Sequence, residues 1–164
     1  MKKKDVWKIS FRSHKLFSLK YALRLNCLDN QNLEYEKRLL YFIHRYHHKI
    51  NNVCKNNGLK PLETLIEYNT YDIHKDIPNK LENYIIDNSK WVPAIEAYMI
   101  IQRLHDKIYQ DSIRFGWFPN HRKQVLNELE ISLKFAKTAS QKNGQFNLCL
   151  LEAPENDKHR FIWG

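Results

Sequence analysis

Residues 91–116 constrain the fold of this chain more than any other stretch. Apolar residues occupy most of the circumference of a helix here, in two adjoining sets. The first set is Trp91, Ile95, Tyr98, Met99, Tyr109 and Ile113, and the second is Ala97, Ile100, Ile101, Leu104 and Ile108. Because a helix that is apolar over most of its surface is normally buried by several neighbours, we predict a central buried helix over about 92–114.

The other periodic segments complete a mainly helical prediction. Residues 31–57 give the cleanest amphipathic pattern, with an apolar stripe from Leu39 to Cys54 and Gly58 as the C-terminal cap. Four further segments show helical spacing or a proline that suits a first turn: 14–28, 61–68, 78–87 and 120–142. We therefore predict a bundle of five or six helices packed around residues 92–114.

Strand patterns occur only near the two ends of the chain. Residues 5–12 alternate apolar and polar side chains, and 145–152 and 159–163 are short apolar runs around a polar turn. These segments predict a small sheet that joins the termini. A length of 164 residues corresponds to one domain. The predicted fold is thus mainly α, with residues 1–164 as a single domain.

Composition excludes several classes of protein. Hydrophobic residues make up 43% and aromatic residues 13%, which is typical of a globular chain. The cysteines, Cys27, Cys54 and Cys149, are widely spaced and include no CxxC pair, which argues against a disulfide framework and favours a reducing compartment such as the cytoplasm. No apolar run reaches the ~18 residues of a membrane-spanning helix, so we expect no membrane partner. We also expect no cofactor, and no pattern specifies the oligomeric state.

The positive charge of the chain is large and uneven. The formal net charge is +9, and residues 1–24 carry eight Lys/Arg against one acid. Such a basic cluster is typical of proteins that bind nucleic acid, and it also suits an acidic protein partner. The leading prediction is a non-enzymatic protein that binds DNA, RNA or a ribonucleoprotein complex.

One predicted helix face has the residue types that single-stranded nucleic acid requires. In the helix predicted over 31–57, cations alternate with an aromatic ring on the polar side, so that phosphates and a base can both be contacted. This face comprises Arg38, Tyr41, Arg45, His48 and Lys49, and the N-terminal cluster adds Lys8, Arg12, Lys15 and Lys20. A solvated helix face without a partner is the structural alternative.

The stretch RFGWFPNH, from Arg114 to His121, has an Arg-x6-His spacing. It resembles the Arg-x(4–6)-His signature of HEPN ribonucleases, which are small helical bundles that cleave RNA without a metal, often across a dimer. The resemblance implies that Arg114 stabilises the phosphate and that His121 transfers protons. Gly116 and Pro119 depart from the helical context of that signature. The structural alternative is that Arg114 stabilises a helix C-terminus and that His121 begins the next helix.

Two further clusters have both a functional and a structural interpretation. His44 and His48 have the i, i+4 spacing of metal ligands, but no carboxylate lies at ExxH spacing, so we predict no metal site. The aromatic residues Trp117, Phe118, Phe161 and Trp163 suit either a protein-binding hot spot or the closing of one end of a bundle. A protein-binding inhibitor or adaptor, of the type found in phages and mobile elements, is therefore a further alternative function.

Overall fold

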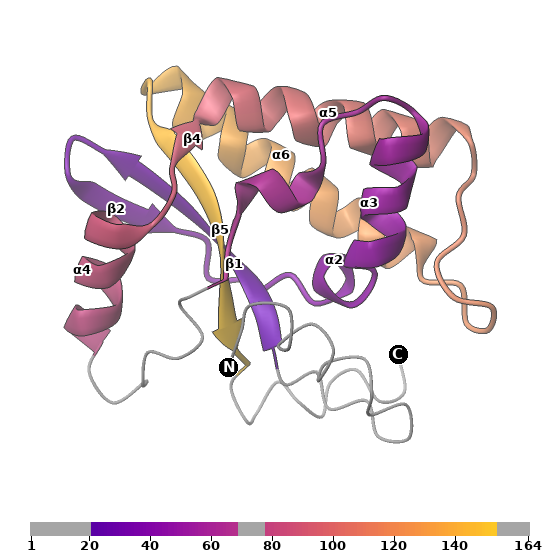
Figure 1. Cartoon of the computed structure of the whole chain (residues 1–164), viewed down its shortest axis with the longest axis horizontal. Coiled ribbons are helices and arrows are strands. Elements are labelled where there is room, and N and C mark those ends of the chain that lie inside the picture. The colour runs from indigo at the N-terminus through magenta and orange to yellow at the C-terminus, as the bar shows by residue number, and fades with distance from the viewer. Residues whose placement is uncertain (1–20, 69–77, 154–164) are drawn as a thin grey trace.

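The computed structural model describes residues 21–68 and 78–153, and these form an α/β fold around a mixed five-stranded sheet (Figure 1). The strands are β1 (Tyr21–Asp29), β2 (Asn32–Tyr35), β3 (Ile66–Glu67), β4 (Val92–Pro93) and β5 (Gln145–Glu152). The order is β2-β1-β5-β3, with β4 also paired to β5. β1 and β5 are antiparallel over eight residue pairs, from Tyr21↔Glu152 to Leu28↔Gln145, whereas β3 is parallel to β5.

Helices flank this sheet. In the described residues they are α2 (Phe42–Arg45), α3 (His47–Asn56), the 3-10 turn η1 (Leu62–Leu65), α4 (Pro78–Asn88), α5 (Ala94–Gln110) and α6 (Arg122–Gln141). Figure 1 shows α5 and α6 side by side across the top of the view, with α2 and α3 at the right and α4 near β2 at the left. No helix in the described ranges is long and apolar enough to cross a bilayer.

The two faces of the sheet differ in polarity because side chains alternate along each strand. On one face Leu23, Leu25 and Cys27 of β1 pair with apolar residues of β5 and pack against α5 and α6; the Phe135 ring of α6, for example, contacts Phe146 of β5 edge-on at 6.2 Å. On the other face β1 carries Arg24 and Asn26, which are buried.

The mainly-α prediction is wrong, because the core is built on a sheet. The helix predicted over 14–28 is strand β1 from Tyr21 onward: the helical spacing of its leucines coincides with a strand alternation of Leu23, Leu25 and Cys27. The single helix predicted over 31–57 divides into β2, an isolated bridge between Leu23 and Leu40, and then α2 and α3. Within 61–68, only a 3-10 turn forms before β3.

Four elements lie where the sequence predicted them. They are the helices over 78–87, 92–114 and 120–142, observed as α4, α5 and α6, and the strand over 145–152, observed as β5. β5 lies inside a five-stranded sheet, so the sheet is larger than the small terminal one that was predicted. The strands predicted over 5–12 and 159–163 lie outside the described residues.

Helix α5 is not buried all round, which corrects the prediction of a central buried helix. Its second apolar set is in the core, with Ala97, Ile101, Leu104 and Ile108 fully buried. Of the first set, Ile95, Met99 and Tyr109 face outward, at 55%, 46% and 63% exposed, whereas Tyr98 and Ile113 pack against the core. The centre of the fold is the sheet and not α5, so α5 buries only the face that packs on its neighbours.

We expect Leu104→Ala to lower the free energy of unfolding by about 2–5 kcal/mol, because a fully buried leucine leaves a cavity between α5 and its neighbours. Met99→Ala is the matched control on the same helix, and its exposed side chain predicts a change within about 0.5 kcal/mol. Urea titration of both variants measures the difference. Equal losses would mean that the buried face of α5 is assigned incorrectly.

Candidate nucleic-acid interface

The structure distributes the predicted nucleic-acid-binding residues over different environments. His48 and Lys49 are exposed on α3, and the Arg45 guanidinium lies 5.2 Å from the centre of the Tyr46 ring. Arg38 precedes α2 and makes a two-pronged ion pair with Glu36, with both N–O distances at 3.1 Å. Tyr41 is buried, so its ring is not on the surface. Lys8, Arg12, Lys15 and Lys20 lie outside the described residues.

A buried carboxylate fixes the position of α2. Glu128 of α6 accepts backbone hydrogen bonds from Tyr41 (2.8 Å), Phe42 (3.0 Å) and Ile43 (2.8 Å), at the start of α2. Burial raises the pKa of Glu128 to about 7, whereas the three N–H donors lower it. These bonds satisfy the free N–H groups of the helix terminus and join α2 to α6, so the basic segment that follows Tyr41 is held against the rest of the fold.

Two of the three neighbouring histidines are also buried. Burial lowers the pKa of His44 to about 4 and is the main cause that lowers the pKa of His47 to about 3, so both rings are neutral near pH 7. His47 Nδ1 lies 2.8 Å from the His44 carbonyl oxygen, and the His47 and His48 rings are 4.1 Å apart. Of the three, only His48 is exposed.

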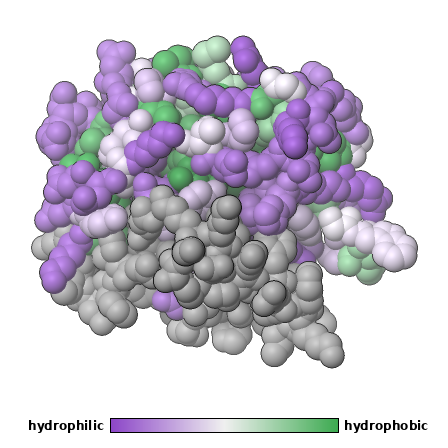
Figure 2. Space-filling view, viewed as in Figure 1, coloured by the Kyte–Doolittle hydropathy of each residue, from purple (hydrophilic) through white to green (hydrophobic). Residues whose placement is uncertain are grey.

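The loop between α5 and α6 presents two aromatic side chains to solvent. Trp117 is 92% and Phe118 is 96% exposed. The loop projects at the right of Figure 1, and pale and green atoms project at the same place in the space-filling view of Figure 2. Purple, hydrophilic side chains cover most of the remaining described surface in that view. Contiguous apolar groups on a surface are candidates for an interaction site.

Backbone and side-chain hydrogen bonds hold the base of this loop. The His121 N–H donates to the Phe115 carbonyl (2.7 Å), and Asn120 Oδ1 accepts from the N–H groups of Phe115 (2.9 Å) and Arg122 (3.1 Å). Phe115 is fully buried, and Arg114 donates to the Trp117 carbonyl at 2.9 Å. Each end of the loop is thus fixed, and the exposed rings are presented on an ordered backbone.

Gly116 is required where the loop meets α2 and α3. Its φ is +84°, and an added Cβ would lie 2.8 Å from Tyr46 Oη and 2.9 Å from the Pro119 carbonyl oxygen. The same Tyr46 hydroxyl lies 2.6 Å from His121 Nδ1, and burial raises the pKa of this tyrosine. The Phe42 and His121 rings are 5.0 Å apart. The loop therefore packs directly on the helical segment that carries Arg45, His48 and Lys49.

Arg114 and His121, the two residues of the HEPN-like spacing, point to different partners. Arg114 is exposed and bonded to the loop carbonyl, while His121 is buried beside Tyr46 and Phe42. The helical bundle that the resemblance implies is not the fold observed.

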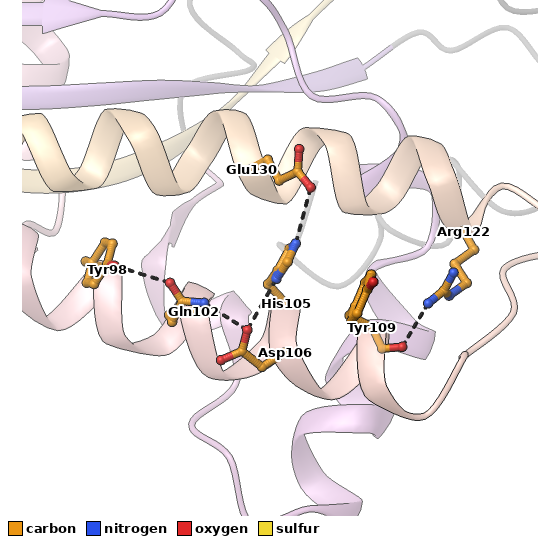
Figure 3. A network of polar contacts seen from close by, with 7 residues as sticks. All are labelled: Tyr98, Gln102, His105, Asp106, Tyr109, Arg122 and Glu130. Carbon is orange, nitrogen blue, oxygen red and sulfur yellow. Dashed lines mark hydrogen bonds and ion pairs between the residues drawn. The ribbon is translucent and has the colours of Figure 1, made fainter.

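Helix α5 carries a second set of polar contacts near the loop (Figure 3). Gln102 Nε2 donates to Asp106 Oδ1 (2.9 Å), and His105 lies 3.4 Å from Asp106 and 3.5 Å from Glu130 of α6. The Arg122 guanidinium donates to the Tyr109 carbonyl at 2.8 Å. His105 and Asp106 thus form part of a partly exposed network that joins α5 to α6.

Two segments, residues 41–58 with α2 and α3 and residues 112–126 with the α5–α6 loop, meet at one end of the molecule and contain cations but no acids. Residues 41–58 have three Lys/Arg and three His, and residues 112–126 have three Lys/Arg, but neither includes Asp or Glu. The Lys49 ammonium lies 5.6 Å from the centre of the Phe115 ring, which brings the two segments together. Sequence reasoning missed Arg122 and Lys123, although the absence of acids over 112–126 was a usable signal.

Within the described ranges, no group of three His, Cys, Asp or Glu side chains is arranged to hold a metal ion. All three cysteines are buried, and no disulfide joins them. Comparison of the chain with protein-family models, with curated proteins and with solved structures gives no significant match.

Gly116→Ala should destabilise the protein more than Gly58→Ala. Both glycines have positive φ, which disfavours any Cβ, but nothing lies within 4 Å of a Cβ added at Gly58. Gly58→Ala measures the backbone cost of about 1–2 kcal/mol, and the excess in Gly116→Ala, of about 1–3 kcal/mol by the usual cost of overpacking, measures the contact with Tyr46 and Pro119. Equal losses in urea unfolding would show that the loop does not pack this closely.

The stability of the protein should fall as the pH falls from about 6.5 to about 4, in part through His44. Its pKa is lowered in the folded state, so the unfolded state binds the proton more tightly in this range. In His44→Gln this contribution is absent. The wild-type protein should lose about 2 kcal/mol relative to the variant between about pH 7 and pH 5. Urea unfolding at the two pH values measures it, and comparing the variants cancels the opposite contribution of Glu128. Parallel pH profiles would contradict the prediction.

Proposed function

We propose that this protein binds single-stranded nucleic acid, without catalysing a reaction, through the end formed by α2, α3 and the α5–α6 loop. The observation that carries the proposal is the pair of exposed rings, Trp117 and Phe118, on a fixed loop beside segments that hold cations but no acids. Aromatic rings stack on unpaired bases, and cations contact the phosphates.

The order of the loop favours binding. A base that stacks on Trp117 or Phe118 gains about 1–3 kcal/mol by the usual effect of such a ring. Because Asn120 Oδ1 accepts two backbone hydrogen bonds and Arg114 donates one to the loop, the loop backbone is already held, and little of this free energy is lost in ordering it.

The charges in the first turn of α6 are a second supporting feature. Arg122 and Lys123 occupy this turn, and it contains no acidic residue. Cations are disfavoured at a helix N-terminus because the helix dipole is positive there. An anionic partner would remove this repulsion, and the phosphate backbone supplies a row of negative charges at close spacing.

A protein partner is the alternative for an exposed aromatic pair. Lysine is depleted in protein–protein interfaces relative to the rest of the surface, whereas Lys49 and Lys123 flank this loop in space or in sequence. Cations beside stacking rings are the combination that single strands require, so nucleic acid fits this surface better.

Replacing both exposed rings should weaken binding to a single strand. We expect Trp117→Ala/Phe118→Ala to raise the Kd for an oligonucleotide of about 12 nucleotides by at least tenfold, since each ring stacks on about one base. Ile95→Ala/Met99→Ala is the control, because these side chains are exposed and apolar but belong to α5. Fluorescence anisotropy gives the Kd values. An equal loss in both double variants would mean that the rings do not contact the bases.

The contribution of the cations is tested by the salt dependence of the binding constant. Arg45→Glu/Lys49→Glu should reduce the slope of log K against log salt by about 1.4 if each cation contacts one phosphate of a single strand. Lys134→Glu/Lys137→Glu, on the exposed side of α6, makes the same change in net charge elsewhere and should alter the slope less. Binding that is indifferent to salt would favour a protein partner. RNA cleavage that His121→Ala abolishes would instead favour the ribonuclease alternative.

A further inference from the structure

Arg24 of β1 is a buried cation without a carboxylate partner in the described part of the chain. It is 8% exposed, and in the described structure it contacts the Asn26 side chain and the Tyr35 ring, whose centre lies 4.3 Å from the guanidinium carbon. Burial lowers its pKa, and the attraction of Cys149, Tyr35 and Glu82 raises it. A buried charge is costly unless it is paired.

Of the two parallel donors of the Arg24 guanidinium, Nε has a hydrogen-bond acceptor and Nη2 has none in the described structure. Nε donates to Asn26 Oδ1 at 2.8 Å, whereas Nη2 is buried and meets no acceptor among the described residues. Nε and Nη2 together form the pair of donors that holds a carboxylate or phosphate with two parallel hydrogen bonds. Arg38 uses its own pair in this way on Glu36. Arg24 has the same two donors, but only its Nε has an acceptor among the described residues.

The side-chain amides of Asn26 and Asn147 continue the hydrogen-bonded chain from Arg24 on β1 to β5. Because Arg24 Nε fixes Asn26 Oδ1 toward itself, the Asn26 amino group must face Asn147, and it donates to Asn147 Oδ1 at 3.0 Å. Cys149 Sγ donates to the same oxygen at 3.5 Å. Asn147 Nδ2 is then a buried donor that also meets no acceptor. Rotating either amide by 180° would bring two donors together, so the direction of this chain is determined.

We propose that Arg24 and Asn147, on the polar face of the β1–β5 pair, form a binding site for an oxyanion, carried as a phosphate or a carboxylate group. The unused donors at the two ends of one hydrogen-bonded chain, Arg24 Nη2 and Asn147 Nδ2, select a group that only accepts hydrogen bonds and is negatively charged. The Tyr35 ring, 43% exposed, lies with its centre 4.3 Å from the Arg24 guanidinium carbon. This site is separate from the aromatic loop and does not depend on the proposed function.

Glu82 of α4 is the protein group that competes with this interpretation. It attracts the Arg24 guanidinium, but no ion pair joins the two in the described structure. If Glu82 were the counter-ion of Arg24, an added anion would have no role. The experiment therefore includes a variant of this residue.

The test measures thermal unfolding with inorganic phosphate, acetate or chloride at equal ionic strength. Phosphate or acetate should raise the Tm by a few degrees in a saturable manner, while chloride should not. The effective ion identifies which group the site accepts. Arg24→Gln should weaken the binding at least about tenfold, because a charge-assisted pair is lost. Arg38→Gln removes an equal charge from an exposed, paired arginine and should leave the binding unchanged.

A second variant keeps the test decisive if Arg24→Gln does not fold. Asn147→Asp replaces the unused donor with a carboxylate oxygen that repels an anion, so the protein should lose its response to phosphate and acetate. In the wild-type protein, the side-chain amide signal of Asn147 in a 1H–15N spectrum should shift along one saturable curve. A Tm that no oxyanion raises beyond chloride overturns the proposal. So does a loss of stability in Glu82→Gln that comes with a gain in the response to phosphate, because Glu82 would then be the counter-ion of Arg24 in the wild-type protein.

Discussion

The antiparallel pairing of β1 with β5 is the interaction on which the other elements depend. It joins strands that begin and end the described chain, since the bonded side chains of Asn26 and Asn147 are 121 residues apart. α5 and α6 bury their apolar sides on one face of this pair, and β3 and β4 pair with β5. Because non-local pairing must offset a large loop-closure entropy, the helices between the strands have to bring the two segments together.

How much of this fold the sequence predicts depends on the range of each interaction. The sequence predicts helices α5 and α6 because the apolar residues of each repeat at helical spacing within one segment. It does not predict strand β1, because Leu19, Leu23 and Cys27 match a helical repeat as well as a strand alternation. What selects the strand is the partner: Leu23, Leu25 and Cys27 lie opposite Leu150, Leu148 and Phe146. No local pattern contains that information.

The candidate interface likewise has a part that the sequence predicts and a part that depends on long-range contacts. Trp117 and Phe118 were recognised as a cluster from the sequence, and Lys49 as part of a basic face, but as parts of separate sites. Their common location depends on contacts such as Tyr46 with His121, 75 residues apart, and Glu128 with the start of α2, 85–87 residues apart. Each of these joins polar groups that have no periodicity, so only the folded chain shows that the two segments meet.

The net charge of +9 is a poor guide to where an anion binds, because many cations are already neutralised or buried. Exposed pairs join Arg38 to Glu36, Lys60 to Glu96, Lys107 to Asp111 and Lys142 to Glu34. Pairs of this kind contribute little stability, but they cancel the field that a distant phosphate would feel. Arg24 was counted in the basic N-terminal cluster, yet it lies inside the sheet. The cations of 41–58 and 112–126 have no acid in their own segments, so no neighbouring acid in the sequence cancels their charge at the end where the exposed rings lie. The distribution of acids, more than the number of bases, therefore determines where on the described surface positive charge is left uncancelled.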